Sequence, residues 1–257
     1  MTENNFLKLV QVLTDAEPPR VWSLLVSVFG DLAQAPDATI SGPVVNHLLG
    51  LIGIKPEAIR VALHRLKKDG WIDSRRIGRR SIYFLTPKGR AESAAASPRI
   101  YATRADAMAW LILSEPGRGE EQPDDGAQIA PGLRISTMQA GPDTLSWPVA
   151  AASPLPQWIT ERSCAPDIVS QSRDLATRLT RLDQIIQPGT NLSPAEVAAL
   201  RVLIVHSWRR IILKLPDLPD AAFPVAWAGG ACRSRMAGLL DMLPKPALAD
   251  LEQDLAA

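Results

Sequence analysis

Residues 55–90 have the sequence KPEAIRVALHRLKKDGWIDSRRIGRRSIYFLTPKGR, and this stretch decides the expected fold. Its first half predicts a helix that starts near Pro56 and stops at Gly70. The apolar side of that helix consists of Ala58, Ile59, Ala62, Leu63 and Leu66. Two short strands, residues 71–76 and 81–85, then flank a predicted loop of Ile77, Gly78 and Arg79, a length that suits a β-hairpin.

The same stretch carries a concentration of positive charge. Residues 55–90 contain eleven Lys and Arg against three Asp and Glu, a net charge of +8, whereas the whole chain carries +1 and the remainder therefore −7. Attraction to a polyanion depends on the distribution of charge more than on its total. A solvated helix face and hairpin would also be charged, but the excess of arginine over acid favours a nucleic-acid-binding surface.

The residues before this stretch predict two more helices. Residues 21–32 are almost continuously apolar, as in a buried helix. Ser41 is suited to cap a second helix, with Pro43 in its first turn and Gly50 at its end. Three helices followed by a basic hairpin predict a winged helix-turn-helix domain over residues 21–96, with an N-terminal arm over residues 1–20.

The predicted DNA contacts lie on the third helix and on the hairpin. Arg60, Val61 and His64 are expected to face base edges in the major groove, flanked by cations that approach phosphates. The hairpin arginines are expected to reach phosphates or the minor groove. The predicted DNA-binding residues are Arg60, Val61, His64, Arg65, Lys67, Lys68, Arg75, Arg76, Arg79, Arg80, Ser81 and Tyr83.

The rest of the chain predicts two further regions, which makes the expected class α+β. Residues 97–166 contain short apolar runs separated by Gly, Pro and acidic residues, typical of a middle domain with short strands. Residues 167–257 return to helical periodicity and predict a C-terminal helical domain. Ser193, Pro194 and Glu196 form a capping-box pattern that opens one of its helices.

Several classes of protein have little support in the sequence. No apolar run is long enough for a membrane span and the N-terminus does not resemble a signal peptide, so a cytoplasmic location is expected. Cys164 and Cys232 lack the spacing of a metal knuckle and are expected to be buried thiols. No phosphate loop, metal-ligand cluster or nucleophile elbow is visible, so we expect no catalytic residue, no metal and no enzymatic activity.

Four motifs resemble those of the PaaX family, regulators of phenylacetic acid degradation. They are SLLVSVFGD at 23–31, IRVALHRL at 59–66, GW at 70–71 and GRRSIYFLT at 78–86, and RIY at 99–101 and HSWRR at 206–210 extend the resemblance. The resemblance implies a homodimeric repressor of an aromatic or acyl-CoA catabolic operon, with a ferredoxin-like middle domain. It also implies release from a double-stranded DNA operator by a CoA thioester such as phenylacetyl-CoA.

A CoA thioester would need cations for its phosphates and an apolar slot for its acyl end. The predicted ligand residues are Arg201, Trp208, Arg209, Arg210, Lys214 and Trp227. The same residues would equally suit a helix C-terminus and core packing, so that alternative stays open. Two other functions also stay open: a DNA-binding regulator without an inducer, and a nucleic-acid-processing enzyme.

Overall fold

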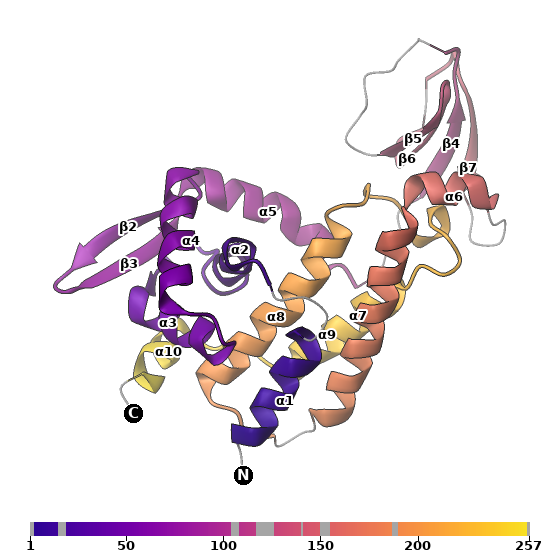
Figure 1. Ribbon diagram of the computed structural model, residues 1–257. Helices are drawn as coiled ribbons and strands as arrows, with labels where there is room; N and C mark the ends of the chain where they lie inside the picture. The colour runs from indigo at the N-terminus through magenta and orange to yellow at the C-terminus, as the bar shows by residue number, and fades with distance from the viewer. Residues whose placement is uncertain are drawn as a thin grey trace. The chain divides into compact units, whose positions relative to one another are not determined.

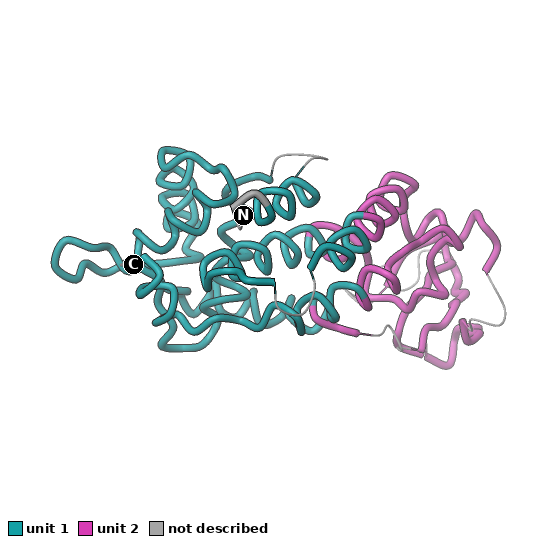
Figure 2. Tube along the Cα trace, turned by 90° about the horizontal axis from the view of Figure 1, so that it is seen from below, with its two compact units in different colours: residues 1–100, 178–209, 235–257 teal, residues 101–177, 210–234 magenta. Residues whose placement is uncertain are grey.

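The computed structural model of this chain describes residues 3–14, 19–103, 108–116, 126–139, 141–149, 155–186 and 190–255. It contains helices and two small antiparallel sheets, which confirms the predicted α+β class (Figure 1). Its residues form two compact units (Figure 2). Unit 1 comprises residues 1–100, 178–209 and 235–257, and unit 2 comprises residues 101–177 and 210–234. The predicted domain boundaries at 20, 96 and 166 stay a prediction.

The N-terminal part of unit 1 has the three helices and the hairpin that the sequence predicts, in the predicted order, together with α1, α5 and the short strand β1, which was not predicted. They are α1 (Glu3–Thr14), α2 (Val21–Leu32), β1 (Ile40–Ser41), α3 (Gly42–Leu51), α4 (Pro56–Lys68), β2 (Ile72–Ile77), β3 (Arg80–Leu85) and α5 (Pro87–Tyr101). The Ser41 hydroxyl accepts a hydrogen bond from the Val44 N–H at 3.3 Å and so caps α3 as predicted. The three strands form an antiparallel sheet in the order β1-β3-β2.

The core of this part lies between α2 and α4. Leu25, Val28 and Phe29 of α2 are completely buried, and so are Ile59 and Leu66 of α4. Burying a side chain of this size stabilises the fold by about 1.5–3 kcal/mol. The apolar spacing in the sequence therefore identified the packed faces of both helices, and it leaves the opposite face of α4 to solvent.

The hairpin turn is shorter than predicted. Ile77 pairs with Arg80 across the two strands, so the loop contains only Gly78 and Arg79 instead of three residues. Gly78 has a φ of 59°, in the left-handed region that glycine adopts without a steric penalty. A two-residue turn with glycine first matches the right-handed twist of the strands, which explains why the strands extend one residue further.

The C-terminal residues form the helices α7 (Pro166–Ile185), α8 (Pro194–Ile212), α9 (Gly229–Met242) and α10 (Leu248–Asp254). The capping box that opens α8 is confirmed. The Ser193 N–H donates to Glu196 Oε2 at 2.8 Å, and the Glu196 N–H donates to Ser193 Oγ at 3.3 Å. Of these helices, residues 178–185, 194–209, 235–242 and all of α10 belong to unit 1.

A row of polar contacts joins α2 to α8 inside unit 1, and we call it the polar seam. Ser23, Ser27 and Asp31 follow one another at four-residue spacing on α2 and so share one face of the helix. Arg209 donates to Ser23 Oγ at 2.8 Å, His206 Nδ1 lies 3.3 Å from Ser27 Oγ, and Arg201 contacts both carboxylate oxygens of Asp31 at 3.2 Å. The seam sets the register of α2 against α8.

The helix α1 occupies the segment predicted as an N-terminal arm. Phe6, Leu9 and Leu13 on its apolar side are buried. Arg178 donates a hydrogen bond at 2.8 Å to the carbonyl oxygen of Leu13. Both residues belong to unit 1, so the apolar side of α1 packs into that unit.

Unit 2 contains a four-stranded antiparallel sheet, β4 (Ala109–Leu113), β5 (Gly126–Ala130), β6 (Leu133–Ser136) and β7 (Leu145–Val149), in the order β5-β6-β4-β7. The helix α6 (Gln157–Ser163) follows β7. A ferredoxin-like chain has the order β-α-β-β-α-β. Here the described residues between β6 and β7 contain no helix, because that connection is short and includes Gly141 and Pro142.

Candidate nucleic-acid interface

The outer face of α4 carries the predicted base-contacting residues. Arg60, Val61 and His64 are all exposed, and Val61 has 66% of its surface exposed although it is apolar. Successive residues of a helix are rotated by about 100°, which puts Val61, His64 and Lys68 within about 60° of one another. This face therefore combines an exposed apolar side chain with hydrogen-bond donors, as base edges in a major groove require.

Arg60 and Arg65 lie on opposite flanks of that face. Arg65 is held in place by two contacts. Its guanidinium carbon lies 5.5 Å from the centre of the Trp22 ring at the start of α2, and its Nε lies 3.8 Å from the Asp69 carboxylate. The sequence shows Trp22 only as one of the apolar residues of a buried helix, because a contact between helices leaves no trace in local spacing.

If Arg65 contacts DNA, Trp22 positions it, and Trp22→Leu is expected to weaken DNA binding about two- to five-fold, the equivalent of an exposed cation–π contact. Trp22→Phe should keep affinity close to that of the wild type, since phenylalanine retains a π face. Fluorescence anisotropy with labelled duplex DNA measures both variants. In an Arg65→Ala background Trp22→Leu should have no further effect; an undiminished loss there would show that Trp22 acts only on folding.

Lys67, on the other side of α4, is tied to the base of the hairpin. Its Nζ lies 2.8 Å from Ser74 Oγ and 3.1 Å from Asp73 Oδ1. The Ser74 N–H donates a hydrogen bond to Asp73. This hydrogen bond and, to a smaller extent, the contact with Lys67 lower the pKa of the Asp73 carboxyl below its ordinary value. Asp73 therefore stays ionised near neutral pH, and Lys67 links the helix to the hairpin.

The strand register divides the hairpin residues between two faces. Arg76 pairs with Ser81, and Ser74 pairs with Tyr83, so these four side chains share one face. The pair Ile72 and Leu85 on this face is buried in the core and Ser74 contacts Lys67 of α4, which makes this the face next to the helix. Arg75 and Arg80 lie on the other face, and Arg80 Nη1 is 3.4 Å from Glu252 Oε2 of α10.

Most of the positive charge on this surface has no acidic partner among the described residues. Among the ion pairs that the described residues form, none involves Arg60, Arg75, Arg76 or Arg79. Arg65, Lys67 and Arg80 do have carboxylate partners, but these pairs are exposed. Exposed pairs are worth about 1 kcal/mol or less, so a phosphate can displace the carboxylate. The predicted contacts are thus gathered on one helix and one hairpin of unit 1.

The six predicted ligand residues are divided between the two units. In unit 1, Arg201 is buried in the polar seam and also donates to the Leu240 and Leu243 carbonyls. Trp208 is completely buried, and its indole N–H donates to the Ile100 carbonyl at 3.1 Å. Arg209 contacts Ser23. Their role as ligand contacts stays a prediction.

The other three predicted ligand residues belong to unit 2. Lys214 Nζ donates to Gln171 Oε1 at 3.2 Å, and Arg210 is partly buried. The Trp227 indole N–H donates to Asp220 Oδ1 at 2.8 Å, and its ring lies 5.4 Å from that of Phe223. The sequence does not indicate that Asp31, Asp220 and Phe223 are neighbours of the predicted ligand residues, because these three come from other elements.

The two predicted thiols are buried, as expected. Cys164 and Cys232 have no more than 1% of their surface exposed, and both are free cysteines. Cys232 Sγ contacts the carbonyl oxygen of Ser172. In the part of the chain that the structure describes, no group of three His, Cys, Asp or Glu is arranged to hold a metal ion, and no helix is long and apolar enough to cross a membrane.

Comparison with known proteins identifies the family to which this chain belongs. Residues 20–89 match the family model described as PaaX-like protein, and residues 167–252 match the model described as PaaX-like protein C-terminal domain. The Transcriptional repressor PaaX of Escherichia coli (strain K12) is 30% identical over an alignment of 278 positions, which covers 93% of this chain and 85% of the relative. The chain belongs to the PaaX family, as its motifs predicted.

Proposed function

We propose that this protein is a sequence-specific transcriptional repressor that binds operator DNA through a winged helix-turn-helix formed by α2, α3, α4 and the β2–β3 hairpin. The observation that carries the proposal is the exposed cationic surface of α4 and the hairpin, most of which has no acidic partner in the described part of the chain. In this proposal α4 enters the major groove. Arg60, Val61 and His64 contact bases, while Arg65, Lys67 and Lys68 approach the backbone and the hairpin acts as the wing.

The geometry supports different roles for the two faces of the wing. Arg76 lies on the hairpin face next to α4, together with Ser81 and Tyr83, and Arg79 lies in the turn. Arg75 and Arg80 lie on the other face. We therefore assign phosphate contacts on the helix side to Arg76 and Arg79. Arg75 and Arg80 contribute to the general positive field that attracts DNA.

Family membership supports a regulator in place of an enzyme. We propose that it controls an aromatic or acyl-CoA catabolic operon. We propose a cytoplasmic homodimer, because two copies of the recognition helix match a palindromic operator with half-sites about 34–36 Å apart. A CoA thioester such as phenylacetyl-CoA is the proposed inducer. A regulator without an inducer remains the second candidate, and titration of the operator complex with CoA thioesters distinguishes the two.

The wing assignment has a direct test in the salt dependence of binding. Arg76→Ala is expected to reduce the slope of log affinity against log salt by about 0.9, the contribution of one phosphate contact. Arg80→Ala serves as the matched control, since it removes the same charge from the other face of the hairpin. Anisotropy titrations over about 50–200 mM salt measure both slopes. An equal change for the two variants would contradict the assignment of the helix-side face.

A further inference from the structure

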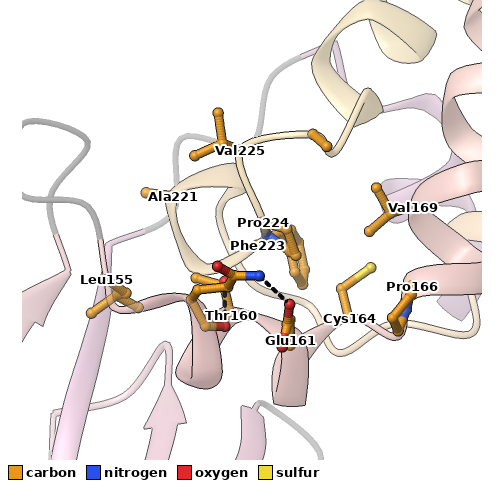
Figure 3. A pocket seen from close by; sticks show the side chains of 12 residues that line it. Leu155, Thr160, Glu161, Cys164, Pro166, Val169, Ala221, Phe223, Pro224 and Val225 are labelled. Carbon is orange, nitrogen blue, oxygen red and sulfur yellow. Dashed lines mark hydrogen bonds between the residues drawn. The ribbon is translucent and has the colours of Figure 1, made fainter.

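Unit 2 contains a cavity of about 420 Å³ that none of the predicted DNA or ligand residues lines. Its walls come from α6, the start of α7 and the segment 221–226, so residues about 60 positions apart in the chain meet there (Figure 3). Leu155, Val169, Phe223 and Pro224 supply apolar surface. A volume of 300–1,000 Å³ is typical of small-molecule sites, and this cavity falls in that range.

The polar groups of the cavity are few and carry no positive charge. Glu161 is the one charged side chain among the lining residues, and Gln157 Nε2 donates to its Oε1 at 2.6 Å. The Cys164 side chain lies near Val169 on the α7 side (Figure 3). Burial and, to a smaller extent, the negative charge of Asp167 raise the pKa of the Cys164 thiol to about 11. This sulfur is therefore uncharged at neutral pH.

These features determine which ligand the cavity can hold. An apolar group gains about 25 cal/mol for each Å² of surface that it removes from water. A carboxylate would lose its hydration without a cation among the lining residues, and it would face the negative charge of Glu161. The cavity therefore suits an apolar group that has no negative charge of its own.

We propose that this cavity is the effector site of the protein, that it takes a small neutral aryl or alkyl group, and that Glu161 selects against anions. The proposal rests on the proposed function, because it supplies the place where the apolar end of an inducer binds. A thioester is neutral at its acyl end, whereas the corresponding free acid is not. The site thus separates an activated acid from its free form by charge.

The test compares two ligands that share a benzyl group and differ in charge, phenylacetamide and phenylacetate. Saturation-transfer NMR on the full-length protein measures the affinity of each without DNA. The amide is expected to bind at least tenfold more tightly than the acid. Glu161→Gln should reduce that difference about threefold, since it removes the charge and keeps the shape. The lost hydration of the carboxylate still favours the amide in this variant. Equal binding of the two ligands to the wild type would overturn the proposal.

Filling the cavity with a larger side chain tests whether the ligand binds there. Ala226 lines the cavity and is exposed, so Ala226→Phe can block it without disturbing the core. This variant is expected to lose at least tenfold in affinity for phenylacetamide. Ala231→Phe is the matched control, because Ala231 is exposed on α9, also belongs to unit 2 and does not line the cavity. Unchanged binding by Ala226→Phe, or an equal loss in both variants, would place the ligand elsewhere.

Failure of this site and failure of the repressor assignment give different results. The variants Glu161→Gln, Ala226→Phe and Ala231→Phe leave α4 and the hairpin intact. Their affinity for operator DNA without a small molecule should therefore equal that of the wild type. Loss of amide binding with intact DNA binding supports the cavity as the effector site. Absence of operator binding by the wild type would count against the proposed function and would leave the binding data on the cavity valid.

Discussion

Asp31→Ala is expected to lower the free energy of unfolding by about 3–5 kcal/mol, because it removes one partner of a buried ion pair. The Asp31 and Arg201 side chains are only 3% and 9% exposed, and Arg201 contacts both carboxylate oxygens. Without Asp31, the Arg201 guanidinium keeps its hydrogen bonds to the Leu240 and Leu243 carbonyls. Its charge would nevertheless have lost its buried counter-ion.

Equilibrium unfolding in urea, followed by circular dichroism, measures this loss. Asp31→Leu combined with Arg201→Met is the informative control, since it replaces both charges with apolar side chains. The double variant should be clearly more stable than Asp31→Ala, because no unpaired charge is left inside the protein. A loss below about 1 kcal/mol for Asp31→Ala would mean that water reaches this part of the polar seam.

Arg60→Ala is expected to cost about 1–3 kcal/mol of binding free energy at the cognate operator, or about 5- to 150-fold in affinity. Arg60 is exposed on the outer face of α4 and forms no ion pair with the described residues. A side chain that donates two hydrogen bonds to a guanine loses both when it is truncated. Affinity for random DNA should fall much less.

Lys55→Ala is the matched control for Arg60→Ala. Lys55 is an exposed cation that precedes the first turn of α4, where it can reach a phosphate but contributes nothing to base recognition. Its loss should weaken operator and random DNA by similar factors. Competition titrations with both duplexes give the two ratios. Equal losses on the two duplexes for Arg60→Ala would reassign Arg60 to the DNA backbone.

The local elements of the candidate interface could be predicted because their determinants are close together in the sequence. Ser41 caps the helix that it precedes, and the apolar spacing from Ile59 to Leu66 faces the core. The turn length was wrong, and the short strand β1 was not predicted. The sequence alone does not show that Gly78 favours a two-residue loop over a three-residue one, since both lengths occur in hairpins.

The partners of the buried charges could not be predicted, because they come from distant parts of the chain. In the sequence, Arg201 resembles a ligand-binding residue because two other cations, Arg209 and Lys214, follow it closely. Its counter-ion Asp31 precedes it by 170 residues, on a helix that looks uniformly apolar. The cavity in unit 2 poses the same difficulty, since its walls combine residues 155–169 with residues 221–226.

Equilibrium binding of the full-length protein to DNA selected from a random pool tests the central claim most directly. We predict that the selected duplex binds at least about 10³-fold more tightly than a scrambled duplex of the same length. We also predict that its affinity falls steeply as salt rises. Equal affinity for the two duplexes, or binding that does not respond to salt, would contradict the claim that the cations of α4 and the β2–β3 hairpin recognise an operator.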